Sequence, residues 1–368
     1  MYEFLRAILA FVFVLGVLVF IHELGHYLAA RWRGIYVDVF SIGFGQPLYR
    51  WHDKTGTEWR ISAIPLGGYV KPHGFEGPEE ASPEQKSSWI PGKTFHEKPV
   101  SSRAIVTVAG PVFNFLLAII LFTGLFAVSG RILVKPLVQD TLPNSAAAQA
   151  GLKPNDLIIK LDNIENPDVQ KVIDFAHTHP GYSTNLVIKR QEKEITLPIT
   201  VGQTMQNGKA VGQLGIAMGG VVAMSKPLPL GKSIIVATQE TWNLSVQTLV
   251  GLGEVISGKR SAKELGGPLR IAQISGEVAQ GGFSKLVFFM GLLSVNLGLI
   301  NLLPIPVLDG GRLLFYGIEA VLGRPVNRKV QEWVFTASFV LIFLLFLIVT
   351  FNDASSMGLF RWLTGHTH

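Results

Sequence analysis

The sequence contains no cysteine among its 368 residues. Disulfides and thiolate metal sites are therefore excluded, and any bound zinc must use His, Asp or Glu. Charged residues are also scarce, at 16% of the chain, against roughly 25% in soluble domains. A net charge of +6 comes without a basic stripe interleaved with aromatics, so nucleic acid is not an expected partner. The expected partner is the lipid bilayer, through its anionic headgroups.

Four stretches are nearly free of charge: residues 7–21, 104–128, 286–303 and 334–351. With help from flanking residues, each is long enough to cross about 30 Å of hydrocarbon as a helix. The first stretch continues into Ile21-His22-Glu23 rather than a small-residue cleavage site, so we interpret it as a retained span and not as a signal peptide. The pattern predicts a polytopic α-helical membrane protein with about four transmembrane helices.

Lysine and arginine set the expected orientation, because they stay on the cytoplasmic side of short loops. Ten of them lie between Arg31 and Arg103. This places the loop after the first span in the cytoplasm and both termini outside it. The long segment between the second and third spans is then also extracytoplasmic.

The chain between the spans predicts two further structures. Aromatic and β-branched runs on both sides of a polar turn indicate a β-hairpin over about residues 41–70, and residues 71–100 are expected to form a loop. Residues 131–220 are soluble in character and predict a small α/β module, with strands at 157–161, 186–190 and 195–201 and a helix at 169–176. The expected divisions are an N-terminal membrane half (1–130), this module (131–220), an amphipathic interfacial helix with a linker (221–283), and a C-terminal membrane half (284–368).

The strongest chemical signal is His22-Glu23-Leu24-Gly25-His26. On a helix, positions four apart share a face, so both imidazoles can reach one zinc ion while Glu23 activates a water molecule. A shuffled chain of this composition would show His-acid-x-x-His only about 0.015 times. The motif ends an apolar span, where ionisable residues are costly and usually functional.

Two histidines leave a catalytic zinc ion short of a third protein ligand. A candidate is Asp309, in the segment Asn301-Leu302-Leu303-Pro304-Ile305-Pro306-Val307-Leu308-Asp309-Gly310-Gly311, where prolines and glycines break the third span. Broken backbone at membrane depth is tolerated where it is buried in protein or lines a wet cavity. Taken alone, the segment would equally fit a turn at the membrane edge with a capping aspartate.

These two motifs together resemble the site-2 protease family. The likeness extends to its branch of bacterial regulators of sigma-E protease (RseP). It continues through Gly43-Phe44-Gly45, Ala109-Gly110-Pro111 with Asn114, and the run from Pro65 to Lys71. The resemblance implies the core of the site-2 protease fold, a membrane-associated β-hairpin, and one inserted PDZ-like domain in the soluble module. Gln46, where Pro is common, and a single PDZ module, where several relatives carry two, are departures.

The resemblance also implies roles. It assigns one Zn²⁺ ion to His22, His26 and Asp309, general base and acid catalysis to Glu23, and a supporting catalytic role to Asn301. It expects the hairpin to pair with unwound substrate. Asn114 matches a family asparagine, although a polar contact between helices explains it equally well. The residues expected to bind substrate are Gly43, Phe44, Gly45, Pro304 and Pro306.

The implied activity is intramembrane proteolysis in the bacterial inner membrane. Expected substrates are single-pass membrane proteins such as an anti-sigma factor after a first cut, or remnant signal peptides, and the PDZ-like domain is expected to bind C-terminal peptides. Two rival functions remain. A catalytically silent membrane scaffold should lack Glu23 or a metal ligand, and a zinc transporter should carry polar ligands at successive depths, whereas the sequence has all four residues and one cluster.

Overall fold

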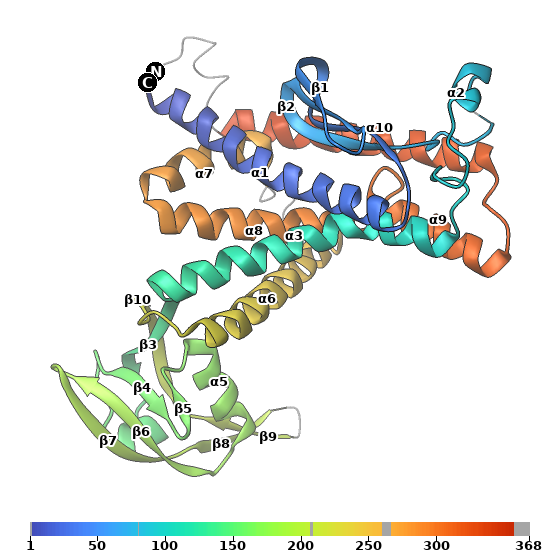
Figure 1. The fold of residues 1–368 in the computed structure, drawn as a ribbon. Coiled ribbons are helices and arrows are strands. Elements are labelled where there is room, and N and C mark those ends of the chain that lie inside the picture. Colours follow the sequence, from blue (N-terminus) through green and yellow to red (C-terminus); the bar gives the residue numbers. More distant parts are fainter. Residues whose placement is uncertain (1, 80, 207–208, 260–265, 357–368) are drawn as a thin grey trace. The chain divides into compact units, whose positions relative to one another are not determined.

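The computed structural model describes residues 2–79, 81–206, 209–259 and 266–356 (Figure 1). It divides into two compact units, one formed by Met1–Leu125 with Pro229–His368 and the other by Phe126–Leu228.

Four helices of the first unit are long and apolar enough to cross a membrane, over Leu5–Trp32, Val100–Ser129, Phe283–Asn301 and Arg328–Ser356. They belong to α1 (Tyr2–Trp32), α3 (Val100–Ser129), α8 (Phe283–Asn301) and α10 (Arg328–Ser356). Val14 and Leu18 of α1 pack with Met290 of α8 and with apolar residues of α3. The prediction of four long apolar helices is confirmed.

Further helices of this unit are α2 (Pro83–Ser87), α6 (Leu230–Ile256), α7 (Pro268–Gln280) and α9 (Asp309–Leu322). The short α2 lies in the segment expected to be a loop. The segment 221–283 forms two helices where one was expected. The third span ends at Asn301, and the backbone is not helical again until Asp309 begins α9. This break follows from the prolines at 304 and 306, since proline has no N–H to continue a helix.

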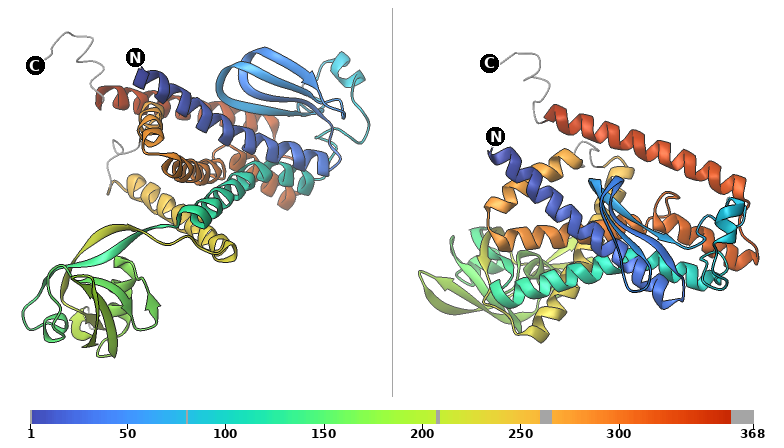
Figure 2. Two further views of the ribbon diagram at one scale, coloured as in Figure 1. Left: turned by 60° about the vertical axis from the view of Figure 1, so that its left-hand side comes forward. Right: turned by 45° about the horizontal axis from the view of Figure 1, so that its top comes forward.

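The predicted hairpin is present as β1 (Val37–His52) and β2 (Glu58–Pro72), but it is more than a simple two-stranded ribbon (Figure 2). Phe40 of β1 pairs with Val70 and also with Trp59, because the long strands bend and β2 passes β1 twice. The turn is fixed to α1, since Asp53 accepts hydrogen bonds from the Tyr27 hydroxyl at 2.8 Å and from the Trp59 indole at 3.0 Å. Residues 68–72 pair on one side only among the described residues, so they form an edge.

The second unit is a β-rich domain. Its main sheet has the order β10-β3-β4-β6-β7, made of β10 (Ile216–Met224), β3 (Ile132–Thr141), β4 (Leu157–Leu161), β6 (Ser183–Arg190) and β7 (Lys193–Thr200), with β5 (Ile164–Glu165) paired to β4. The pair β8 (Gly202–Gln206) and β9 (Lys209–Gln213) and the helices α4 (Ala146–Gln149) and α5 (Val169–Thr178) complete it.

The strands and the helix predicted for this domain are confirmed, with ends shifted by up to three residues. Buried residues of these strands and of α5 form one core, which includes Ile158, Leu161, Val172, Leu186 and Ile188. The strands β3, β5, β8, β9 and β10 were not predicted, and β10 extends the domain beyond the expected end at residue 220.

Acid is expected to destabilise this domain through Asp156, which is fully buried and bonded to Arg190 at 2.7 Å. Burial raises the pKa of Asp156, but hydrogen bonds from Arg190 and from the Lys153 backbone outweigh it, and the pKa lies below its ordinary value. The ionised carboxylate therefore stabilises the domain fully above the ordinary pKa of about 3.9, and this contribution disappears as the pH falls through the lower folded value.

Hydrogen exchange of β4 and β6 amides in the full-length protein measures the effect. Asp156→Asn should cost roughly 1–3 kcal/mol at neutral pH and lose less further protection on acidification than the wild type. Equal acid sensitivity in the two proteins would contradict this role.

Candidate metal centre

The two histidines of the His-Glu-x-x-His motif lie on one face of α1, as their spacing predicts. The Nε2 atoms of His22 and His26 are 3.2 Å apart. Both residues lie in the second half of the span, and His22 is buried. The helix therefore presents two nitrogen donors to one point.

Asp309 reaches the same point from the first residue of α9. Its Oδ2 atom lies 3.2 Å from Nε2 of His22 and 3.4 Å from Nε2 of His26. The three ligand atoms all lie within 4.8 Å of one another. Among the described residues, this is the cluster of three His, Asp or Glu side chains that could hold a metal ion. Oδ2 is buried and makes no hydrogen bond within the described chain. Two imidazoles and a carboxylate match the three protein ligands of a catalytic zinc site, which keeps a fourth position for water or substrate.

Residues of helix α3 contact both imidazoles. Nδ1 of His26 donates to the backbone carbonyl of Val106 at 2.8 Å, which leaves Nε2 free to bind a metal. Close approach depends on glycine: a Cβ atom on Gly110 would stand 2.3 Å from Nε2 of His26, and one on Gly25 would stand 2.5 Å from the Ala109 carbonyl oxygen. Larger residues at these two positions would separate α1 from α3 or displace the ligands.

Asn114, one helical turn beyond Gly110, contacts the other imidazole. Its amide nitrogen lies 3.0 Å from Nδ1 of His22, while its own Oδ1 atom is buried and makes no hydrogen bond within the described chain. A neutral imidazole that offers Nε2 to a metal carries its proton on Nδ1, so that nitrogen requires an acceptor. The two ends of an amide have the same shape, so turning Asn114 over places Oδ1 as that acceptor. Metal binding therefore favours the turned amide.

Two further contacts fix the helices that carry the site. The Arg103 guanidinium of α3 forms two hydrogen bonds to Glu319 of α9, at 3.1 and 2.7 Å. The Ser294 hydroxyl of α8 donates to the backbone carbonyl of Asn114 at 2.7 Å. Both contacts join segments about 200 residues apart in the sequence, and they hold α9 and α8 against α3.

The ligands open into a cavity of about 790 Å³. Glu23 and Asn301 line it together with the edge residues 68–72 of β2. The hairpin approaches Glu23 closely, since a Cβ atom on Gly68 would stand 3.2 Å from Cγ of Glu23. Three essential features therefore share one cavity: a metal-ligand set, a carboxylate beside it, and an open strand edge.

The residues expected to bind substrate are distributed unevenly around this cavity. Phe44 lines it, whereas Gly43 and Gly45 lie in the bend of β1 with positive φ angles of 90° and 84°. Pro304 and Pro306 are outside the set that lines the cavity and serve to break the helix before Asp309.

Sequence reasoning missed Val106, named Gly110 only as part of the family likeness, and left the role of Asn114 open. Their spacing of four residues was the available signal, because it puts all three on one face of α3.

Comparisons with known proteins agree with this geometry. A model of peptidase family M50 matches residues 10–345. A protein from Agrobacterium fabrum that carries the name zinc metalloprotease is 38% identical over 95% of this chain and 96% of its own length. One from Mesorhizobium japonicum with the same kind of name is 40% identical over 95% and 99% of the two chains. The metalloprotease MmpA of Caulobacter vibrioides is 34% identical over 99% of each chain.

The Asn114 contact generates a test of how the histidines are held. Asn114→Leu removes the acceptor for Nδ1 of His22 and should weaken zinc binding about 10- to 100-fold, the usual effect of losing a hydrogen-bond partner of a ligand. Asn114→Asp keeps an acceptor at the same place and should bind zinc far better than the leucine variant. Competition with a zinc chelator measures the affinities, with circular dichroism as the control for folding. Equal zinc affinity in the wild type and a folded Asn114→Leu variant would contradict the assignment.

Proposed function

The chain belongs to peptidase family M50, the site-2 proteases, and from that premise we propose that it cuts single-pass membrane proteins within the bilayer. As a member of this family it is a zinc-dependent metalloendopeptidase. The observation that carries the proposal is the depth of the site. His22, Glu23 and His26 belong to the span Leu5–Trp32, and the cavity in front of them is lined by a strand edge.

The residues at the site divide the chemistry between them. His22, His26 and Asp309 would hold the zinc ion, which when bound supplies a Lewis acid that polarises the peptide carbonyl and lowers the pKa of water. Glu23 faces the same cavity, takes a proton from the attacking water and delivers it to the leaving amine. Asn301, at the end of α8, lines the cavity with its amide and supports the polarised carbonyl oxygen.

The edge of β2 can supply backbone hydrogen-bond partners to a transmembrane helix that must unwind before it is cut. Each backbone group of such a helix is bonded within the helix, so the substrate must unwind before water can reach a peptide bond. An unwound segment loses these bonds unless other partners replace them. Residues 68–72 pair on one side only among the described residues and line the cavity, so the substrate can add there as a strand.

The substrate class follows from the RseP-like motifs. We infer a single-pass membrane protein already shortened by another protease, such as an anti-sigma factor, or a remnant signal peptide. The distribution of Lys and Arg supports placement in the bacterial inner membrane with the hairpin on the cytoplasmic side. A catalytically silent scaffold does not explain why Glu23 and three ligands converge on one cavity. A zinc transporter would need a series of sites, whereas the described residues hold one.

The unit Phe126–Leu228 has the features of a PDZ-like peptide-binding domain. A groove of about 460 Å³ runs between α5 and β10 and is lined by Ile173 and Ala176 on one side and Ile216 and Met218 on the other. Within the described sheet β10 is an edge strand, so a peptide can pair with it. The turn before β10 contains Gly215 with a φ of 72°, which supports a backbone site for a C-terminal carboxylate. This domain would then select substrates before the chemical step.

Replacing Glu23 tests the catalytic assignment. Glu23→Gln should remove proteolysis while zinc stays bound, because Glu23 moves protons and is not counted among the ligands. A loss of at least about 100-fold in rate is expected for removing a general base. The measurements are zinc content of the purified protein and cleavage of a model transmembrane substrate. Retained cleavage or complete loss of zinc would reject the assignment.

Removing the PDZ-like domain tests substrate selection. The chain enters and leaves the domain side by side, since the N–H of Ser225 donates to the carbonyl of Arg131 at 2.9 Å, so a short linker can replace residues 132–224. The test uses two substrates with one transmembrane segment, one with its outer domain intact and one trimmed. The full-length enzyme should cut only the trimmed substrate, and the shortened enzyme should cut both. A folded, zinc-loaded deletion variant that cuts neither, or that still discriminates, would refute the selection role.

A further inference from the structure

Arg312 occupies an unusual position beside the metal ligands. It lies three residues after Asp309 on α9, so both side chains leave the same face of the helix. Arg312 lines the cavity of about 790 Å³ that contains the ligands, and it also lines an adjoining cavity of about 1000 Å³ between α9, the start of α10 and residues 75–79. It therefore stands in the wall between the reacting centre and a second space.

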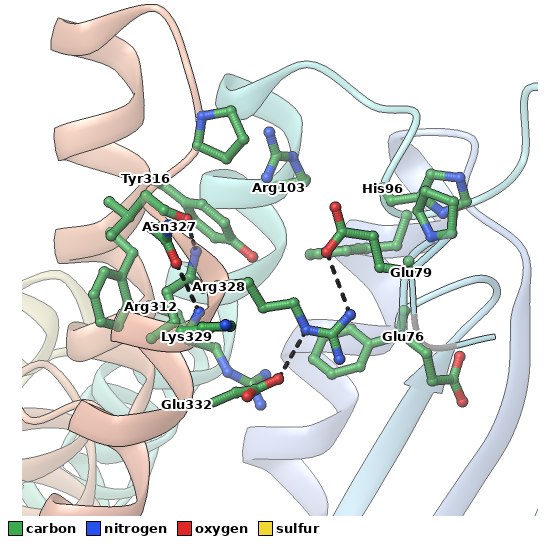
Figure 3. A pocket seen from close by; sticks show the side chains of 18 residues that line it. Glu76, Glu79, His96, Arg103, Arg312, Tyr316, Asn327, Arg328, Lys329 and Glu332 are labelled. Carbon is green, nitrogen blue, oxygen red and sulfur yellow. Dashed lines mark hydrogen bonds and ion pairs between the residues drawn. The ribbon is translucent and has the colours of Figure 1, made fainter.

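The acidic groups around this wall are already paired. Glu76 binds Lys71 at 2.9 Å. Arg328 extends between Glu79 and Glu332 and bonds to both (Figure 3). None of the ion pairs or side-chain hydrogen bonds found in the described chain includes Arg312.

The Phe75 ring covers one face of the Arg312 guanidinium, whereas the N–H groups at its edge can donate hydrogen bonds to a ligand. The group lies 4.8 Å from the centre of the Phe75 ring. A stacked guanidinium keeps its in-plane N–H groups, which match a carboxylate with two parallel hydrogen bonds. Arg103 shows this arrangement completed in the same cavity: it lies 5.0 Å from the Tyr316 ring and donates two hydrogen bonds to Glu319. The Arg312 guanidinium lies over its ring at a similar distance, and no carboxylate of the described chain is paired with it.

We propose that Arg312 binds the α-carboxylate that peptide hydrolysis creates. The water oxygen joins the carbonyl carbon and the C–N bond breaks. Glu23 carries one water proton to the leaving amine, and the new carboxylic acid loses the other proton, which the basic amine can take up. The N-terminal product therefore ends in a new carboxylate beside Asp309, one helical turn from Arg312. Binding at Arg312 would draw this terminus away from the metal ligands and toward the adjoining cavity. The proposal rests on the peptidase activity and not on the membrane location of the substrate.

Direct binding separates this proposal from catalysis. Zinc-loaded full-length protein in detergent is titrated with two N-acetylated peptides of one apolar sequence, one ending in a free carboxylate and the other in a carboxamide. The wild type should bind the acid more tightly. Arg312→Gln should weaken binding of the acid by about tenfold or more, because charge-assisted hydrogen bonds are lost, and should leave the amide unchanged.

Two variants complete the experiment. Lys329 is an exposed cation that lines the adjoining cavity and not the cavity with the ligands. Lys329→Gln removes one positive charge, as Arg312→Gln does, and should leave the affinities for the acid and the amide peptide unchanged. Arg312→Lys keeps the charge without the two parallel donors, so its preference for the acid should fall between those of the wild type and the glutamine variant. An acid-to-amide ratio in Arg312→Gln equal to that of the wild type would overturn the proposal, as would equal weakening of both peptides. If Arg312→Gln retains less zinc than the wild type, the acid-to-amide affinity ratio of Arg312→Lys is used instead. A ratio equal to that of the wild type rejects the proposal.

Discussion

The fold of the first unit depends on the convergence of three ligand atoms that come from segments nearly 290 residues apart. His22 and His26 leave α1, Asp309 begins α9, and their ligand atoms lie within 4.8 Å of one another. A buried carboxylate oxygen without a hydrogen bond and two imidazole nitrogens directed at it are costly to assemble without a shared cation. The proline-containing break after the third long apolar helix serves this convergence, because it lets α9 begin at Asp309. The packing of α1, α3 and α9 therefore determines whether the three side chains can bind one zinc ion.

Helix α3 is the support that makes the convergence accurate. Val106 and Asn114 contact the two imidazoles at Nδ1, and Gly110 lies against their rings. The Val106 carbonyl leaves Nε2 of His26 free for a metal, and Asn114 would do the same for His22 once its amide is turned so that Oδ1 accepts from Nδ1. The β-hairpin completes the cavity from the other side. Residues 68–72 of its edge and Arg312 of α9 both line this cavity.

The sequence allowed the local parts of this architecture to be predicted. Long apolar runs predicted the four long apolar helices, the soluble character of residues 131–220 led to strands β4, β6 and β7, and a spacing of four predicted the histidine pair. The placement of Asp309 needed the resemblance, because its partners lie far away in the sequence and a capping role fitted equally well. The spacing of four places Gly110 and Asn114 on one face of α3, but local periodicity does not indicate which helix that face packs against, so their contacts with the imidazoles were not predicted. The double pairing of β1 was missed for the same reason, because bends change the partners of a strand without changing its composition.

Anomalous scattering at the zinc edge, from crystals of the zinc-loaded full-length protein, tests the central claim most directly. The account predicts one peak at about 2.0–2.2 Å from Nε2 of His22, Nε2 of His26 and a carboxylate oxygen of Asp309. In the same crystals the carboxylate of Glu23 should face the ion without binding it. A peak bound through Nδ1 of either histidine, or with Glu23 in place of Asp309, would contradict the account.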